Sequence, residues 1–249
     1  MFFFDIICRL QEKSITFAEK YITFANTAMD EAILLWVNSH HCAYFDEFMW
    51  MLTYRFTWIP MYLAIAYATV RILGWRRGLL YIIAVALTIL LADQMCSHVI
   101  RPWAERLRPS NLGNPLSAMI HIVHDYRGAP YGMPSCHAAN TMALLTILLW
   151  QFRSRILTVT MVVWMLSQVY SRMYLGVHYP TDLLVGAAVG CICATLIFLI
   201  YSHIVRTYAT FRRDMMLESG RLSMCTAWIP ATLFVETLAV IALLALVFV

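Results

Sequence analysis

Three short clusters of polar residues carry the side chains in this chain that could bind and cleave a phosphate. They are Arg101-x6-Arg108-Pro109, Pro134-Ser135-Cys136-His137 and Ser171-Arg172-x5-His178-x3-Asp182. Arginine side chains can hold phosphate oxygens through planar, charge-assisted hydrogen bonds. The histidines, the serine and the aspartate can attack, orient and transfer protons. Together the clusters predict one site for phosphoryl chemistry.

The predicted catalytic residues are His178, His137 and Asp182. A neutral imidazole nitrogen of His178 can attack phosphorus and form a phosphohistidine intermediate. Asp182, four residues later, would accept the proton on the other ring nitrogen and so fix the tautomer. His137 would protonate the leaving oxygen as a general acid and then activate the water that hydrolyses the intermediate.

The predicted phosphate-binding residues are Arg101, Arg108, Ser135, Cys136 and Arg172. The second cluster leads directly into an apolar segment, and its proline favours the start of a helix, where free backbone N–H groups form an anion site. The alternative interpretation is an ordinary helix cap, with the arginines as anchors at a membrane surface. The combination favours a catalytic site, because charged groups at the edge of a membrane are costly unless they act.

The composition places the chain in the membrane class. Of its 249 residues 61% are hydrophobic and 13% are charged, and the mean hydropathy is +0.69. A soluble domain has about 45–50% apolar and about 25% charged residues. The first residues lack a basic segment and a small-residue cleavage site, so no cleaved signal peptide is expected. The net charge is +4, but the arginines are scattered among apolar segments, which excludes a nucleic-acid surface.

The predicted fold is an all-α, polytopic membrane helix bundle of about six transmembrane helices and one domain. A helix needs about 20 apolar residues to cross a bilayer. The expected spans are roughly Trp58–Leu73, Leu79–Ile100, Ala138–Trp150, Ile156–Tyr174, Asp182–Ser202 and Met224–Val249. The expected parts are an interfacial segment at 1–55, a transmembrane phosphatase core at 56–203, and a cytoplasmic connection with the last helix at 204–249.

The N-terminal segment has apolar residues at helical spacing with charged residues between them, which predicts an amphipathic helix lying in the membrane interface. The apolar residues are Phe17, Tyr21, Phe24 and Ala25. An additional span here is the alternative, but the apolar stretch Ile33–Val37 is cut off by Asn38-Ser39-His40-His41.

The alternation of the spans puts all three clusters on the same side of the membrane, which independently supports a single site. The opposite-side connections carry the arginines Arg76, Arg77, Arg153, Arg155, Arg206, Arg212 and Arg213. Since basic residues mark cytoplasmic loops, the site is expected on the extracytoplasmic face of a bacterial inner membrane.

The clusters resemble the signature of the type-2 phosphatidic acid phosphatase superfamily, which reads Lys-x6-Arg-Pro, Pro-Ser-Gly-His and Ser-Arg-x5-His-x3-Asp. The third cluster matches at every specified position, whereas Arg101 stands where lysine is usual and Cys136 where glycine is usual. The resemblance implies a phosphatase that needs no metal or cofactor and that vanadate inhibits. A thiol beside the phosphate would make the enzyme sensitive to alkylation.

The predicted function is metal-independent hydrolysis of a lipid phosphate through a phosphohistidine. The candidate substrates are undecaprenyl pyrophosphate, phosphatidylglycerol phosphate, phosphatidic acid and lipid A 1-phosphate, which the sequence does not rank. The alternatives are a lipid-to-lipid phosphotransferase using the same site and a non-enzymatic lipid-binding or transport protein. The expected partners are the lipid phosphate and the bilayer, with no nucleic acid and no obligate protein partner.

Further polar features lie between and within the spans. His121-x2-His124-Asp125, in the loop at 110–133, is compatible with a metal site, but a substrate-side loop is preferred because no closed ligand set is evident. Three more residues of this loop could touch the headgroup: Tyr126, Arg127 and Tyr131.

Four other features make structural predictions. Asp93 and Glu236 are expected to face the bundle interior. Gly186-x3-Gly190 predicts close helix packing within the bundle. A disulfide between Cys42 and Cys136 is possible from their expected side of the membrane.

Overall fold

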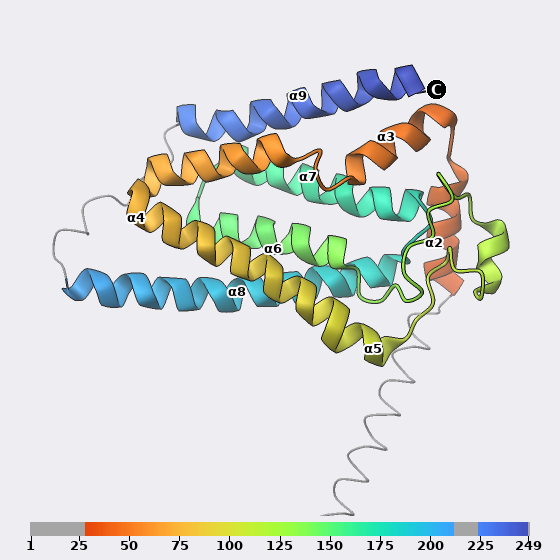
Figure 1. The fold of residues 1–249 in the computed structure, drawn as a ribbon, viewed down its shortest axis with the longest axis horizontal. Coiled ribbons are helices and arrows are strands. Elements are labelled where there is room, and N and C mark those ends of the chain that lie inside the picture. The colour runs from red at the N-terminus through yellow and green to blue at the C-terminus, as the bar shows by residue number, and fades with distance from the viewer. Residues whose placement is uncertain (1–27, 212–223, 249) are drawn as a thin grey trace, which may run out of the picture.

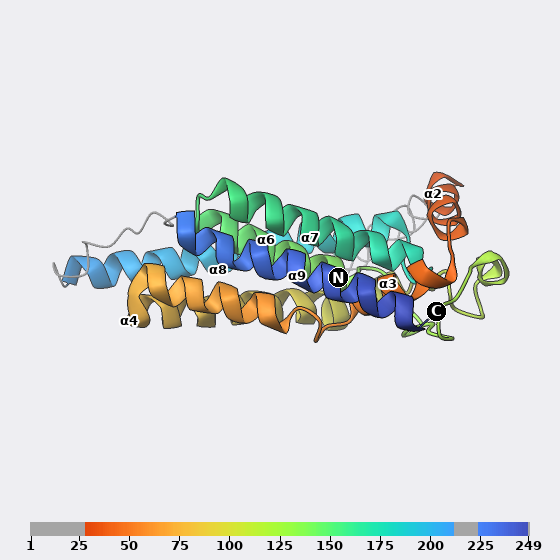
Figure 2. The ribbon, with the colours of Figure 1, turned by 90° about the horizontal axis from the view of Figure 1, so that it is seen from above.

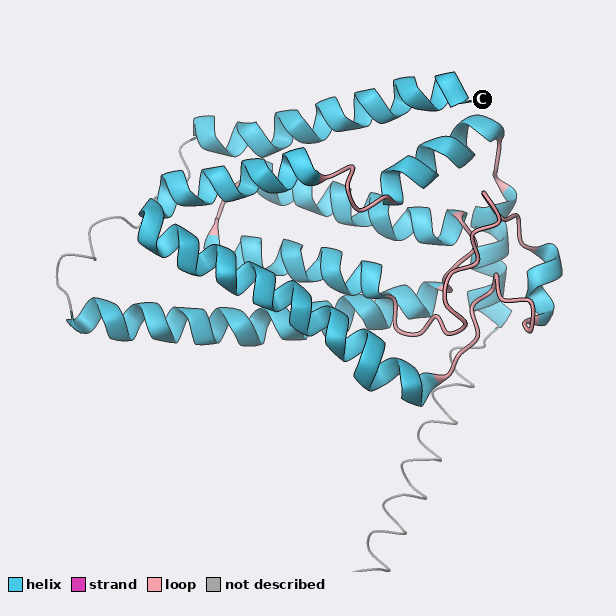
Figure 3. Cartoon of the chain, in the orientation of Figure 1, coloured by secondary structure: helices cyan, strands magenta, loops and turns pink. Residues whose placement is uncertain are grey.

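The computed structural model describes residues 28–211 and 224–248. In these residues the regular structure is helical, apart from one isolated β-bridge, which confirms the all-α prediction (Figures 1 and 3). The α-helices are α2 (Ala28–Ser39), α3 (Ala43–Thr53), α4 (Ile59–Gln94), α5 (Arg101–Ala104), α6 (Cys136–Gln151), α7 (Arg155–Tyr174), α8 (Pro180–Phe211) and α9 (Met224–Phe248). A π-helical turn, Met95–Ile100, joins α4 to α5, and a 3₁₀ helix, Pro115–Met119, lies in the loop before α6.

Helix α4 is bent into two arms that form a V, which Figure 1 shows with its apex at one end of the bundle. The bend is at Gly74, whose φ of 74° and ψ of 161° are not helical and favour glycine. The arms cross closely beside the bend, because a Cβ on Gly78 would lie 2.8 Å from the Cα of Val70. The first two expected spans are therefore the two arms of one bent element.

Three helical stretches among the described residues are long and apolar enough to cross a membrane: Ile59–Ala104, Pro180–Thr207 and Trp228–Phe248. Their outer surfaces carry large apolar side chains such as Leu90, Leu184 and Leu243, which are 55%, 69% and 64% exposed. Such a surface is stable against hydrocarbon, so the chain is an integral membrane protein. Helices α6 and α7 are not in this set, and the number of six spans stays a prediction, as does the division into three parts.

The described part of the chain begins with two short helices. Helix α2 has 12 residues and α3 has 11, and each is too short to cross a bilayer. Figure 1 shows α2 lying across the end of the bundle opposite the apex of α4. The apolar positions used to predict an amphipathic interfacial helix, at 17–25, lie outside the described residues.

Helices α6 and α8 pack backbone to backbone at two glycines of α8. A Cβ on Gly186 would lie 2.3 Å from the carbonyl oxygen of Ser135, and a Cβ on Gly190 would lie 2.1 Å from that of Ala139. Neither position has room for a side chain. The predicted packing role of this glycine pair within the bundle is confirmed.

Helix α9 lies along α4 and α7, as Figure 2 shows from above. Phe234 is buried and stacks on Trp58, with ring centroids 5.6 Å apart. This contact fixes the rotation of α9, and Glu236, two residues later, is exposed on its outer side. The prediction that Glu236 faces the bundle interior was wrong, because the aromatic contact decides which face of α9 is inward.

We expect Gly190→Ala to lower the free energy of unfolding by about 1–3 kcal/mol, because overpacking forces α6 and α8 apart. The measurement is thermal unfolding of the protein in detergent. Ala188→Leu, on the exposed face of the same helix, is the matched control and should leave the midpoint nearly unchanged. Equal unfolding midpoints for wild type and Gly190→Ala would show that α6 and α8 can accommodate a methyl group at this position.

Candidate active site

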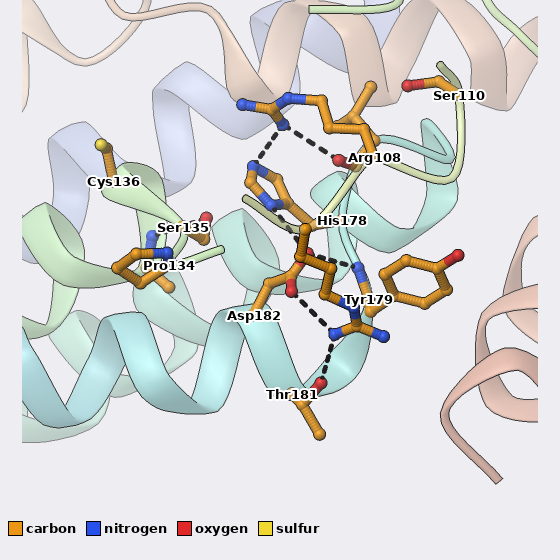
Figure 4. A network of polar contacts seen from close by, with 12 residues as sticks. Arg108, Ser110, Pro134, Ser135, Cys136, His178, Tyr179, Thr181 and Asp182 are labelled. Carbon is orange, nitrogen blue, oxygen red and sulfur yellow. Dashed lines mark hydrogen bonds and ion pairs between the residues drawn. The ribbon is translucent and has the colours of Figure 1, made fainter. Parts of the chain in front are cut away.

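The centre of the site is His178, in the connection between α7 and α8 (Figure 4). Its side chain is 2% exposed. Its Nδ1 lies 3.4 Å from Oδ2 of Asp182, which is fully buried in the first turn of α8. Its Nε2 lies 2.7 Å from Nη1 of Arg108. The sequence prediction that these three residues come together is confirmed by this geometry.

These contacts fix the tautomer of His178. Arginine has donors only, so Nε2 must accept the hydrogen bond from Arg108 and carries a lone pair. The ring proton is then on Nδ1, facing Asp182. Burial, and then the cations of Arg108 and Arg172, hold the pKa of His178 well below its usual value, so the ring is neutral at pH 7. A neutral ring with its lone pair on Nε2 is the form that can attack phosphorus.

Arg108 is held in a wall of backbone carbonyls. Its Nε donates to the Ala129 oxygen at 2.7 Å and its Nη1 to the Val177 oxygen at 2.9 Å. Burial and then the cations of Arg172 and Arg101 lower its pKa to about 10, so it keeps its charge at neutral pH. A phosphate placed for attack at Nε2 of His178 would replace the present contact and meet this cation.

The loop before α6 closes over the pair of Arg108 and His178. An antiparallel bridge pairs Leu107 with Tyr131. A Cβ on Gly132 would lie 3.0 Å from Oδ2 of Asp182 and 3.1 Å from Cγ of Arg108. A side chain at residue 132 would therefore require these neighbouring groups to shift.

The second cluster starts α6 as the sequence predicts. The hydroxyl of Ser135 is the N-cap and accepts from the Ala138 N–H at 3.4 Å, while the Ser135 N–H donates to the Asp182 carbonyl at 3.0 Å. Ser135 therefore acts as a helix cap, and its backbone lies beside that of Asp182.

The two departures from the family pattern contact each other. Nη2 of Arg101 donates to Sγ of Cys136 at 2.9 Å and to the Pro134 carbonyl at 3.0 Å. Cys136 is the first residue of α6, with a helical backbone that needs no glycine. Cys136 and Cys42 are both free, so the possible disulfide between them is not formed.

The remaining predicted residues surround His178. Arg172 is buried, donates from Nη1 to Oγ1 of Thr53 at 3.0 Å, and lies over the ring of Tyr126 at 5.8 Å. His137 is half-buried in the first turn of α6. His137, Arg172 and Arg101 are all close enough to lower the pKa of His178.

Sequence reasoning missed Arg106. Its Nη1 donates to Oδ1 of Asp182 at 2.9 Å, and its Nη2 to Oδ2 of Asp30 at 2.6 Å. Its guanidinium stacks on the ring of Tyr179, with 3.7 Å between Cζ and the ring centroid. Asp30 also accepts from the N–H and the hydroxyl of Thr181, at 3.0 and 2.7 Å. The only sequence signal was an arginine two residues before Arg108 and outside the recognised pattern.

The loop histidines do not form the metal site considered from their spacing. Nε2 of His121 contacts Oδ2 of Asp46 at 2.9 Å, whereas Nε2 of His124 contacts Oε1 of Glu47 at 3.0 Å. Ligand atoms of His41, Asp46 and His121 do lie within 4.8 Å of one another, so these three residues could hold a metal ion away from the phosphate site. The contacts with Asp46 and Glu47 bind the loop to α3.

Arg127, considered for headgroup contact, supports the same loop. Its Nη1 donates to the Ser110 carbonyl at 2.7 Å and to the Ser117 hydroxyl at 3.0 Å.

A cavity of about 600 Å³ opens beside His137 and extends between the two arms of α4, α6 and α7. Most of its wall is apolar, including Trp58, Ile65, Val85 and Leu144. Asp93 lines it too, so the prediction that this residue faces the bundle interior is confirmed.

Known proteins resemble this chain over the part that contains the three clusters. The family model of the PAP2 superfamily matches residues 77–206, which include all three clusters. A lipid A 4'-phosphatase of Bacteroides thetaiotaomicron is 44% identical over 162 residues, covering 65% of this chain and 72% of that protein. A lipid A 4'-phosphatase of Porphyromonas gingivalis is 29% identical over 175 residues, covering 70% and 74%.

Two solved structures share the fold. The crystal structure of Aquifex aeolicus LpxE has a TM-score of 0.51 and 19% identity, covering 69% of this chain and 96% of that one. A PAP2-type phosphatidylglycerolphosphate phosphatase from Bacillus subtilis has a TM-score of 0.53 and 21% identity, covering 80% and 96%. By its sequence and its fold, the chain belongs to the PAP2 superfamily and is a membrane lipid phosphatase.

Proposed function

We propose that this enzyme removes a phosphate from the sugar headgroup of a lipid A-type glycolipid, through a phosphohistidine at His178. The observation that carries the chemistry is the lone pair of Nε2, which Arg108 contacts at 2.7 Å while Asp182 lies at the other ring nitrogen. The named activity of the Bacteroides relative, 44% identical, supports the substrate class. This named activity favours the 4'-phosphate of lipid A as the substrate, and not the 1-phosphate that was among the candidates from the sequence.

In the first step Nε2 of His178 attacks phosphorus, and the bond from phosphorus to the sugar oxygen breaks. His137 gives its proton to that leaving oxygen. Arg108, Arg172 and Arg101 bind the phosphate oxygens, and Asp182 stabilises the positive charge that develops on the ring. In the second step His137 accepts a proton from water, which attacks phosphorus and releases inorganic phosphate and free His178.

The environment of His137 indicates that substrate binding precedes protonation of this residue. His137 lies in the first turn of α6, and burial and then the cation of Arg172 lower its pKa to about 3. Without substrate the ring is therefore neutral at pH 7. A bound phosphate brings negative charge that offsets the arginines, so the acid form of His137 should be populated only after the substrate binds.

The cavity beside His137 supports a lipid substrate. Its volume of about 600 Å³ and its largely apolar wall suit part of an acyl chain, while Cys136 and His137 of the second cluster form its polar end. We place this end on the extracytoplasmic face of a bacterial inner membrane, because most of the arginines outside the clusters lie in the opposite connections.

The first test is phosphate release by the protein in detergent from lipid A, undecaprenyl pyrophosphate, phosphatidylglycerol phosphate and phosphatidic acid. We expect lipid A to be the best substrate and His178→Ala to lower the rate by about 10³-fold or more. His203→Ala, exposed near the far end of α8, is the control and should keep the wild-type rate. Product analysis distinguishes hydrolysis from transfer to a second lipid, and undiminished turnover by His178→Ala would exclude the phosphohistidine.

A second prediction concerns Arg106 as a positioning residue. Arg106→Leu leaves the buried carboxylates Asp30 and Asp182 without their shared cation, and breaking such a network costs about 3–5 kcal/mol. We expect a lower unfolding midpoint and a fall in kcat of about 10–100-fold with little change in KM, because Arg106 does not touch the phosphate. Arg106→Lys should recover part of both losses. A change in KM alone would place Arg106 in substrate binding instead.

A third prediction concerns the thiol beside Arg101. N-ethylmaleimide should inactivate the enzyme by modifying Cys136, because the added group would displace Arg101 from its 2.9 Å contact. Cys136→Gly should stay active and resist the reagent, whereas Cys42→Ser should stay sensitive. Resistance of the wild type would mean that Cys136 is shielded from reagents.

A further inference from the structure

Asn140 lines the cavity and carries a buried acceptor that has no partner among the described residues. Asn140 is on α6, one turn after His137, and its Nδ2 donates to Oδ1 of Asp93 at 3.2 Å. Its own Oδ1 is buried and has no hydrogen-bond partner within the described residues. Because a buried acceptor without a donor is unfavourable, such a group is expected where a ligand completes it.

The orientation of this amide is fixed by its neighbour. The NH₂ group of Asn140 is the donor in its contact with Oδ1 of Asp93, so the amide oxygen points away from this carboxyl group. Rotating the amide by half a turn would bring two oxygens together. The oxygen of Asn140 is therefore directed to another partner.

Two polar neighbours of Asn140 in the cavity wall donate hydrogen bonds to backbone carbonyls of the protein. The hydroxyl of Thr141 donates to the His137 carbonyl at 2.8 Å, and Nε2 of Gln168 donates to the Leu52 carbonyl at 2.9 Å. Both residues line the cavity beside Asn140 and Asp93. Asn140 differs from these two neighbours because it has a buried side-chain atom without a hydrogen-bond partner among the described residues.

We propose that Asn140 and Asp93 form a binding subsite for a hydrogen-bond donor that the lipid carries near its phosphate, such as an amide N–H or a hydroxyl. This inference rests on the proposed function, because it assumes that the cavity takes a lipid. The helical rise puts Asn140 about 4.5 Å beyond His137 along α6. With the phosphate at His137, Asn140 would face lipid atoms that are a few bonds from the phosphorus. N-acylated lipids have a donor at that distance, whereas diacylglycerol esters have none. The subsite would select amide-linked over ester-linked lipid phosphates.

The test is binding, so that it does not depend on turnover. The full chain with His178→Ala, in detergent, is titrated with ceramide 1-phosphate and with phosphatidic acid of matched chain length. Tryptophan fluorescence reports occupancy, since Trp58 and Trp164 line the cavity. We expect ceramide 1-phosphate to bind about tenfold more tightly, as one hydrogen bond to a buried acceptor allows.

Three variants in the same background test the residues. Asn140→Leu should abolish the preference by weakening only ceramide 1-phosphate. Asp93→Asn should do the same without changing the volume, because its new amide can donate to the Asn140 oxygen from within the protein. Thr141→Val is the matched control, because its hydroxyl already bonds to its own helix, and it should keep the preference.

Equal affinity for the two lipids, equal losses for both lipids in Asn140→Leu, or no binding of either lipid would each overturn the subsite. Failure of the proposed function would appear elsewhere, as absence of phosphate release from the lipid panel by the wild type. Selective binding without release would keep the subsite and remove the enzyme assignment.

Discussion

The buried ion network of Asp30, Arg106 and Asp182 is the interaction on which the site depends. It joins α2 and the loop after α5 to the first turn of α8, through contacts of 2.6 and 2.9 Å. Buried charges are stable only when they are paired and hydrogen-bonded. Asp182 uses one oxygen for Arg106, and its other oxygen faces Nδ1 of His178 and accepts the N–H of Tyr179. The same pairing that makes the carboxylate stable thus sets the tautomer of the histidine.

The surrounding cations create a second constraint. Arg108 lies at hydrogen-bond distance from His178, and Arg101 and Arg172 also act on that ring. So much positive charge is unfavourable in a small volume without an anion. The arginines are kept apart by different partners: backbone carbonyls for Arg108, a thiol for Arg101 and a threonine for Arg172. A phosphate would relieve their repulsion, so the arrangement of charges favours an anion at this place.

The parts of the site that sequence reasoning could predict are those set by local spacing. An interval of four residues at the start of a helix places Asp182 beside His178, and proline with serine starts α6. The ionic partner of Arg106 could not be predicted, because Asp30 is 76 residues away and only the tertiary fold joins them. Glu236 was misplaced for a similar reason, since the Phe234 contact with Trp58 sets the rotation of α9. Helical periodicity identified the long apolar segments, but not that α4 is one bent element.

The contact between Arg101 and Cys136 explains how two departures from a family motif can coexist. An arginine is longer than a lysine and has a planar group with several donors. With glycine at 136, Nη2 would keep the Pro134 carbonyl and lose its 2.9 Å contact with sulfur. The thiol of Cys136 therefore gives the Arg101 guanidinium a second contact at the start of α6. The helical backbone at residue 136 accommodates this side chain without strain. The two substitutions are best understood as one change in how the first cation of the site is held.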